Sequence, residues 1–174
     1  EESIAVVTES TNVVAELMKE SNAEEAMNVI GMAALLLNSH HSSDDDGVVD
    51  DQGGSVVDEA AEAVARAERA ELRSTLLAVA ANASAIMAGP TAAQQQASVV
   101  EQLTSAPGEL EAEAISSGLK MVGTIVAFQT DATSVTEESV TSTSDSVVNV
   151  LSNLIDAGIL TPQPTTTTAS RRLV

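Results

Sequence analysis

Oxygen-bearing side chains gather in one short stretch of this sequence, and their spacing resembles that of a calcium-binding loop. The twelve-residue calcium loop carries oxygen ligands at positions 1, 3, 5 and 9, a glycine at position 6 and a bidentate acidic ligand at position 12. The stretch places Ser42, Asp44, Asp46 and Asp50 at the four oxygen positions and Gly47 at the glycine position. The apolar Val49 falls at position 8, where the loop carries an apolar residue. Position 12, however, is Gly53, which has no carboxylate, and Ser42 is a poor substitute for Asp at position 1. We interpret the stretch as a solvated acidic loop, in which Asp44, Asp46 and Asp50 are the ligands if calcium binds.

The chain has two histidines, His40 and His41, and they are adjacent. On a helix or a strand such neighbours point in different directions, so they do not easily share one metal ion. With Asp44 they have the ligand types of a weak zinc site, but surface histidines are the favoured interpretation. Catalysis needs a nucleophile beside a base, or two carboxylates with separated pKa values in one pocket. Every Asp and Glu falls in a polar-face context, so we expect no enzyme and no cofactor.

Two further features point to modification. Asn82 begins the tripeptide Asn-Ala-Ser, which is glycosylated only when a chain is secreted and the asparagine is exposed. A run of threonines beside prolines is typical of O-glycosylated stalks, although it is also typical of ordinary linkers. The run consists of Thr165, Thr166, Thr167 and Thr168. Both sites are therefore conditional on secretion.

The composition constrains the elements that must position these residues. Phe128 is the only aromatic residue among 174, yet 44% of the chain is hydrophobic. Any core must therefore be built from Ala, Val, Leu, Ile and Met, which favours slender, closely packed helices. A chain of this length buries roughly 70% of its unfolded surface, so it can form a core without disulfides, and it has no cysteine.

The net charge of −19 excludes some partners. Phosphate binding needs clusters of Lys and Arg, so we expect no nucleic-acid partner. Cations and basic proteins are better candidates. The longest apolar stretch, residues 29–37, is far shorter than the roughly 20 residues that span a bilayer, so we expect no membrane span. The sequence begins with Glu1 and has no signal-peptide pattern, which leads us to expect a processed product or part of a longer protein.

Apolar spacing and capping residues predict the elements. The first half of the chain should contain helices over 3–20 and from Asn22 to Leu37, where Asn22 and Glu25 form a capping box, and they should make a hairpin at Ser21. A loop over 39–54 and a helix of about 30 residues, ending near Gly89, should follow. Cap signals then start helices at Thr91 with Gln94 and at Ser134, the last ending at Gly158. Between them, apolar spacing predicts a helix from Leu110 to Val126.

The expected fold class is all-α, an array of about six short to medium helices in antiparallel hairpins with one long helix. The expected organisation is an N-terminal helical hairpin over 1–38, an acidic flexible loop over 39–54, a helical bundle over 55–160 and a Pro/Thr-rich linker over 161–174. Residues 91–128 and 134–158 also share a scheme of a capped polar helix, a break and a helix with paired aliphatics. The scheme lacks the fixed period of a named solenoid.

Two segments within these stretches, Ala97–Leu110 and Asp145–Gly158, carry paired aliphatics, a spacer and recurring leucines. This pattern resembles the helical region of receptor-for-egg-jelly modules and the helical subdomain of autoproteolysis-inducing (GAIN) domains in polycystin-1-like surface proteins. The resemblance extends over residues 90–160. The chain contains neither the β-sandwich of that family nor its His-Leu-Ser/Thr cleavage tripeptide, so the resemblance does not extend to autoproteolysis.

The resemblance implies a non-catalytic structural or interaction module of a larger extracellular or ciliary-surface protein. Such a module is a spacer or a docking platform, and its partners are neighbouring domains of the same protein or other surface-protein subunits. Two alternatives stay open: a signalling coiled coil, and a helical adaptor that binds a basic partner through its acidic surface. Apolar residues without a strict seven-residue register count against the coiled coil.

Overall fold

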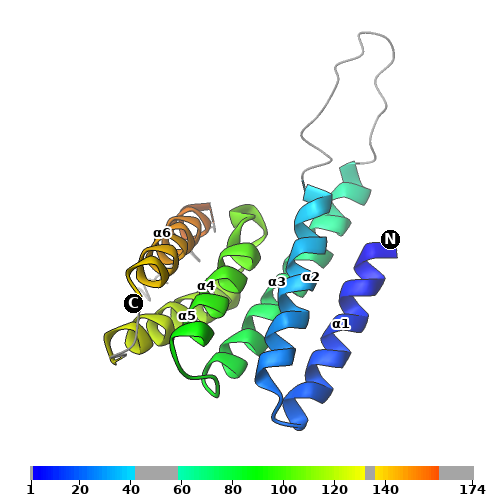
Figure 1. Cartoon of the computed structure of the whole chain (residues 1–174). Helices are drawn as coiled ribbons and strands as arrows, with labels where there is room; N and C mark the ends of the chain where they lie inside the picture. Colours follow the sequence, from blue (N-terminus) through cyan, green and yellow to red (C-terminus); the bar gives the residue numbers. More distant parts are fainter. Residues whose placement is uncertain (1, 42–58, 132–135, 161–174) are drawn as a thin grey trace, which may run out of the picture.

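The structure is a computed structural model that describes residues 2–41, 59–131 and 136–160, and these ranges are all-α, without strands (Figure 1). The helices are α1 (Glu2–Lys19), α2 (Ala23–His41), α3 (Glu59–Ser84), α4 (Pro90–Thr104), α5 (Ala112–Asp131) and α6 (Glu137–Leu160), with a short 3-10 helix, η1 (Pro107–Glu109), between α4 and α5. The longest is α3, with 26 residues. The predicted all-α array of about six helices is confirmed.

The turn between α1 and α2 forms as its residues predict. Ser21 adopts a positive φ of 61°, and the amide of Asn22 donates to the carbonyl of Leu17 at 2.9 Å, which closes the end of α1. Asn22 then caps α2, because its side-chain oxygen accepts from the amide of Glu25 at 3.4 Å. One residue thus ends a helix, and the next begins the following helix in the opposite direction.

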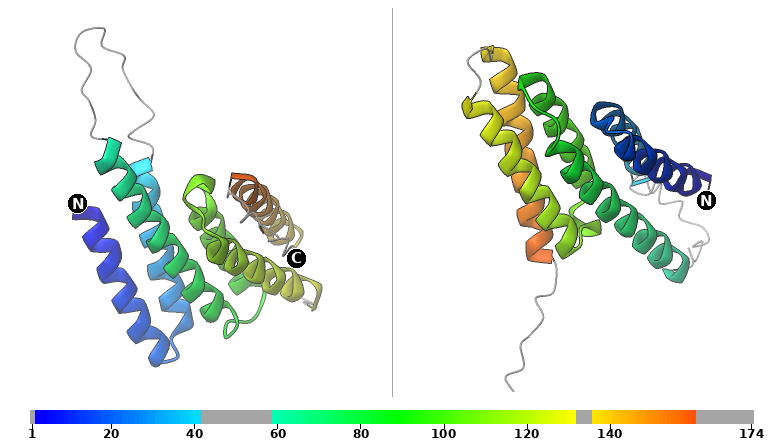
Figure 2. Two further views of the ribbon diagram at one scale, coloured as in Figure 1. Left: turned by 180° about the vertical axis from the view of Figure 1, so that it is seen from behind. Right: turned by 90° about the horizontal axis from the view of Figure 1, so that it is seen from below.

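The six helices form three consecutive hairpins that stack side by side. The pairs are α1/α2, α3/α4 and α5/α6, and the right-hand view of Figure 2 shows them in this order. Helices α1, α3 and α5 pack in order along one layer, and α2, α4 and α6 along the other. Stacked helix pairs of this kind are the building principle of α-solenoids.

Helices α2, α4 and α6 run in the same direction. Between α2 and α4, Asn28 contacts Gln95 and Asn38 contacts Gln102, so residue numbers rise together along the two helices. Between α4 and α6, Asn149 contacts Glu101, and Asn153 contacts Thr104 further along both helices. The furrows between neighbouring helices of this layer are therefore also parallel.

One aliphatic core runs through the stack. It extends without interruption from Val7 on α1 to Ala157 on α6, and small residues occupy much of it, as the lack of aromatics requires. Gly118 on α5 lets α6 approach closely, because a Cβ built there would lie 3.1 Å from Cδ2 of Leu154. At Gly123 a Cβ would meet nothing within 4 Å. Gly118 is therefore a point of close contact between α5 and α6, whereas Gly123 is not.

Three predicted boundaries are wrong. Helix α4 starts at Pro90, because proline is favoured at the first helical position. Its capping residue is Gly89, which has no side chain to make a capping hydrogen bond. Thr91 and Gln94 therefore lie inside the helix. Helix α6 continues past Gly158 to Leu160, so this glycine is not a C-cap. Because residues 137–160 form one unbroken helix, the break that the predicted sequence repeat placed there does not exist.

The remaining boundaries differ by a few residues. Helix α2 continues through His41, past the predicted loop start at residue 39. Helix α5 starts at Ala112, because Leu110 is extended after η1. At the start of α6, Thr136 is the capping residue, since its hydroxyl accepts from the amide of Ser139 at 3.3 Å. The predicted cap residue Ser134 lies outside the described residues.

Candidate functional site

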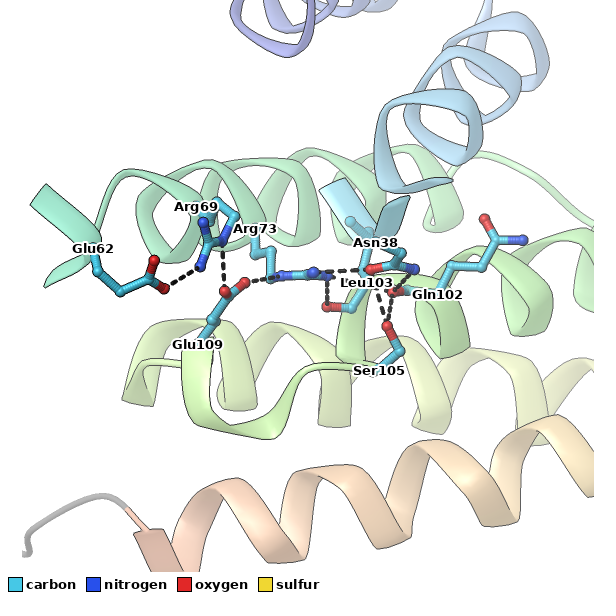
Figure 3. A network of polar contacts seen from close by, with 8 residues as sticks. All are labelled: Asn38, Glu62, Arg69, Arg73, Gln102, Leu103, Ser105 and Glu109. Carbon is cyan, nitrogen blue, oxygen red and sulfur yellow. Dashed lines mark hydrogen bonds and ion pairs between the residues drawn. The ribbon is translucent and has the colours of Figure 1, made fainter. Parts of the chain in front are cut away.

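The buried charged side chains of the described residues form one cluster of three (Figure 3). Arg69 and Arg73 stand four residues apart on α3, so they share one face of the helix. Glu109 reaches them from η1: Nε of Arg69 donates to its Oε1 at 2.7 Å, and Nε of Arg73 to its Oε2 at 2.8 Å. Their exposed fractions are 7% for Arg69, 0% for Arg73 and 4% for Glu109.

The rest of the Arg73 guanidinium binds the ends of two other helices. Its Nη1 donates to the carbonyl of Leu103 at 3.3 Å and lies 3.5 Å from that of Gln102, two of the last carbonyls of α4. Its Nη2 donates to Oδ1 of Asn38, near the end of α2, at 2.8 Å. A cation at a helix C-terminus also interacts favourably with the helix dipole. Arg73 therefore joins α2, α3, α4 and η1.

The Gln102 carbonyl is a second meeting point of this cluster. It accepts from Nδ2 of Asn38 at 3.1 Å and from the hydroxyl of Ser105 at 2.9 Å. Ser105 can alternatively donate to Oδ1 of Asn38, which lies 3.0 Å away. These hydrogen bonds connect the turn after α4 to the end of α2.

The environment of Glu109 determines its charge. Burial by itself raises the pKa of this carboxyl, but the hydrogen bonds from Arg73 and Arg69, together with their positive charges, lower the pKa by more. The net pKa of Glu109 lies below its ordinary value, so the carboxylate is ionised at neutral pH. Two arginines thus face one buried carboxylate. Arg69 also lies 3.7 Å from Oε1 of the half-buried Glu62.

This cluster makes the surface more acidic. Two of the five Lys and Arg residues in the described ranges are the buried Arg69 and Arg73, and the exposed ones are Lys19, Arg66 and Lys120. The cluster withdraws two positive charges and one negative charge from the surface. The outer surface is therefore more negative than the composition alone indicates.

The cluster corrects one sequence-based expectation. Every Asp and Glu was expected in a polar context, and Glu109 is instead buried. A signal for the arginines was present, because Arg69 and Arg73 continue the stripe of Leu76, Leu77 and Ala80 on α3. No local pattern marks Glu109, which lies in a Pro-Gly-Glu turn.

A groove between α4 and α6 is acidic. It encloses about 790 Å³, and Glu101 contributes from α4, while Glu137, Glu138 and Asp145 contribute from α6. The other residues that line it are neutral, so no cation among them balances the four carboxylates. Asn149 donates to Oε1 of Glu101 at 2.7 Å and fixes its position.

A second groove, between α2 and α4, is apolar and uncharged. It encloses about 440 Å³, and Met27, Gly31 and Val99 are among the residues that line it. Met32 and Leu35 stand at its edge, with exposed fractions of 60% and 56%. Large apolar side chains at this exposure, grouped around a groove, are typical of a contact surface for another molecule.

The candidate metal ligands lie largely outside the described ranges. Asp44, Asp46 and Asp50 do so, and the interpretation of this stretch as a solvated acidic loop stays a prediction. His40 and His41 belong to the last turn of α2, whereas Asp44, the third residue of the less favoured zinc site, is not described. Over 2–41, 59–131 and 136–160, no group of three or more His, Cys, Asp or Glu residues is arranged to hold a metal ion.

The two glycosylation candidates differ in what the structure shows. Asn82 is exposed near the end of α3. Thr165, Thr166, Thr167 and Thr168 lie outside the described residues. Asn82 thus meets the exposure condition for its modification, whereas secretion stays an expectation.

The fold and these grooves define the class of protein as an all-α array of stacked helical hairpins with an acidic surface. Among the described helices, none has both the length and the apolar character to cross a membrane. No protein-family model, curated protein or solved structure matches this chain.

Proposed function

We propose that this chain is a non-catalytic interaction module that serves as a docking platform for neighbouring domains or subunits. The observation that carries this proposal is the pair of grooves on either side of α4, one apolar and one acidic. Both are open to solvent between parallel helices of one layer. Stacked helix pairs commonly use such extended surfaces for binding.

The buried cluster supports the same proposal. Arg73 fixes the ends of α2 and α4 relative to α3, so the layer that bears both grooves is held in one arrangement. A docking surface on a fixed scaffold loses little conformational freedom when it binds. The packing of the helices in two layers also favours a platform over a signalling coiled coil, which would expose a long two-helix rod.

The setting of the module is part of the proposal. We place it in a larger extracellular or ciliary-surface protein, in keeping with its resemblance to helical modules of polycystin-1-like proteins. Exposed Asn82 supports this setting, since an exposed sequon is a glycosylation acceptor in a secreted protein. Mass spectrometry of peptides from the native protein tests the setting: a glycan on Asn82 supports it, and an unmodified Asn82 throughout counts against it.

The experiment for the docking function is site-specific photo-crosslinking in the native, full-length protein. A photoreactive amino acid replaces Met32 or Ser98 on the α2/α4/α6 layer, and a third variant carries it at Leu119 on the opposite layer as a control. All three positions are exposed. We expect crosslinks to neighbouring domains or subunits at Met32 and Ser98 in clear excess over Leu119. Equal yields at all three positions would refute the docking platform.

A further inference from the structure

The two grooves lie side by side on the surface of one helix. Ser98 lines the α2/α4 groove, and Glu101, three residues further along α4, lines the α4/α6 groove. Residues three apart on a helix have Cβ atoms about 5–6 Å apart. A molecule seated in the apolar groove is therefore within side-chain reach of the acidic one.

The apolar groove fits an apolar stripe of a helix. Each residue that lines it is uncharged, although the chain carries a net charge of −19. Its edge combines the exposed side chains of Met32 and Leu35 with the amides of Asn28 and Gln95, which hydrogen-bond each other at 2.8 Å. Unbranched methionine adapts to differently shaped apolar partners. An amphipathic helix laid in a groove presents such a stripe at positions i, i+3, i+4 and i+7.

The acidic groove determines the charge of that partner. Four carboxylates line this groove, and none of its other lining residues is basic; they are those of Glu101, Glu137, Glu138 and Asp145. The groove runs parallel to the apolar one because α2, α4 and α6 share one direction. A helix in the α2/α4 groove thus has the carboxylates alongside it over several turns. Lys or Arg on that flank gains attraction, whereas an acidic partner, including a second copy of this chain, is repelled.

We propose that the α2/α4/α6 layer binds a basic amphipathic helix of a partner protein, with the apolar stripe in the α2/α4 groove and the basic flank against the α4/α6 groove. This inference rests on the proposed docking function and names the chemistry of the partner. The apolar groove supplies most of the contact, and the carboxylates fix the orientation of the helix and accelerate its association.

The test uses the purified chain and a labelled synthetic peptide of 18 residues, with leucines at i, i+3, i+4 and i+7 and lysines along one flank. A peptide of the same composition in scrambled order keeps the charge but loses the stripe. Binding is followed by fluorescence anisotropy at two salt concentrations. We expect saturable one-to-one binding of the patterned peptide and at least about tenfold weaker binding of the scrambled one, since a few buried apolar anchors dominate such interfaces.

Variants of the chain locate the binding. Leu35→Glu places a charge in the apolar groove, and Leu119→Glu makes the same change at a comparably exposed leucine on α5. We expect L35E to weaken binding by about tenfold or more and L119E by less than about twofold. The double variant Glu138→Gln with Asp145→Asn should reduce both affinity and its salt dependence, whereas Glu111→Gln with Glu113→Gln, outside the grooves, should change neither.

Each of four results would overturn the inference. Equal binding of the scrambled peptide would show general attraction to an acidic surface. Equal effects of L35E and L119E would place the contact outside the groove. Concentration-dependent dimerisation that L35E abolishes, seen by sedimentation without peptide, would assign the groove to a second copy. Crosslinks at Met32 in the native protein, without peptide binding, would retain the docking platform and refute only the basic helix.

Discussion

Arg73 donates from Nε to Oε2 of Glu109 at 2.8 Å and thereby joins α3 to η1 across 36 residues of sequence. The same guanidinium binds the last turn of α4 and the side chain of Asn38 on α2. Four segments therefore depend on one side chain. Because a buried charge is costly unless it is paired, removing either partner leaves the other in an unfavourable environment.

Glu109→Gln should destabilise the fold by about 3–5 kcal/mol, the loss typical of a broken buried ion pair. The substitution removes the buried carboxylate that pairs with both Arg69 and Arg73, while Arg69 keeps the half-buried Glu62 at 3.7 Å. Chemical denaturation monitored by circular dichroism measures the free energy of unfolding. Glu111→Gln is the matched control, since Glu111 is exposed two residues away, and it should change stability by less than about 0.5 kcal/mol.

The same pair of variants tests the pH dependence. Because the pKa of Glu109 is lowered in the folded state, its stabilising contribution is fully present above the unfolded pKa of about 4.3. The contribution is lost as the pH falls through the lower folded pKa. We expect the stability of the parent protein to fall on acidification below about pH 4.3, and that of E109Q to fall less over this range. Parallel profiles for E109Q and the parent would contradict the role of Glu109.

Arg73→Lys should destabilise the fold by about 2–3 kcal/mol although it keeps the charge. A single ammonium group cannot reach Glu109, the α4 carbonyls and Asn38 together, as the planar guanidinium does. Arg66→Lys is the control, because the side chain of Arg66 is largely exposed and lies 3.9 Å from Glu62. Thermal and urea unfolding distinguish the two variants. Equal stability of R73K and R66K would mean that the fork geometry of Arg73 is unimportant.

Local sequence patterns predicted the helices but not the way they stack. Asn22 and Glu25 identify the start of α2 correctly, because a capping box acts within one turn. Pairings such as Gly31 with Val99 join helices that lie far apart in sequence, and no periodicity within one helix specifies its neighbour. At Gly158, α6 continues to Leu160 although the local signal predicted a stop.

The candidate site was harder to predict for the same reason. Glu101 and Asp145 share a groove only because α4 lies beside α6, and a single sequence does not show this. The arginines of the cluster could have been suspected, since Arg69 and Arg73 lie in line with apolar residues on α3. Their partner Glu109 could not, because its Pro-Gly turn has the same composition as a turn whose glutamate faces solvent.

Gln96→Met should stabilise the fold by about 1 kcal/mol. Gln96 is fully buried on α4, and neither its Nε2 nor its Oε1 has a hydrogen-bond partner. An unpaired buried amide costs about 1–3 kcal/mol, and methionine has a similar length without the polar atoms. Gln94→Met, on the exposed side of α4, is the control and should have little effect on the urea midpoint. Destabilisation by Q96M would indicate that the amide has a role in the core.

Gly118 and Gly123 both lie on α5, five residues apart, and they should respond oppositely to alanine. Gly123→Ala should stabilise the fold by about 0.5–1 kcal/mol, because alanine is the better helix former and its Cβ would meet nothing within 4 Å. At Gly118 the new Cβ would lie 3.1 and 3.2 Å from the two terminal methyl groups of Leu154, so the leucine must move or α6 must shift outward. We expect overpacking to cancel the helix-propensity gain and to destabilise G118A by about 1 kcal/mol. Thermal unfolding of the two variants measures the difference directly.

The double variant Gly118→Ala with Leu154→Val, which removes one methylene from the contact, should be less destabilised than the sum of its two single substitutions. An equal gain in stability from both alanines would show that α5 and α6 are not in close contact at Gly118.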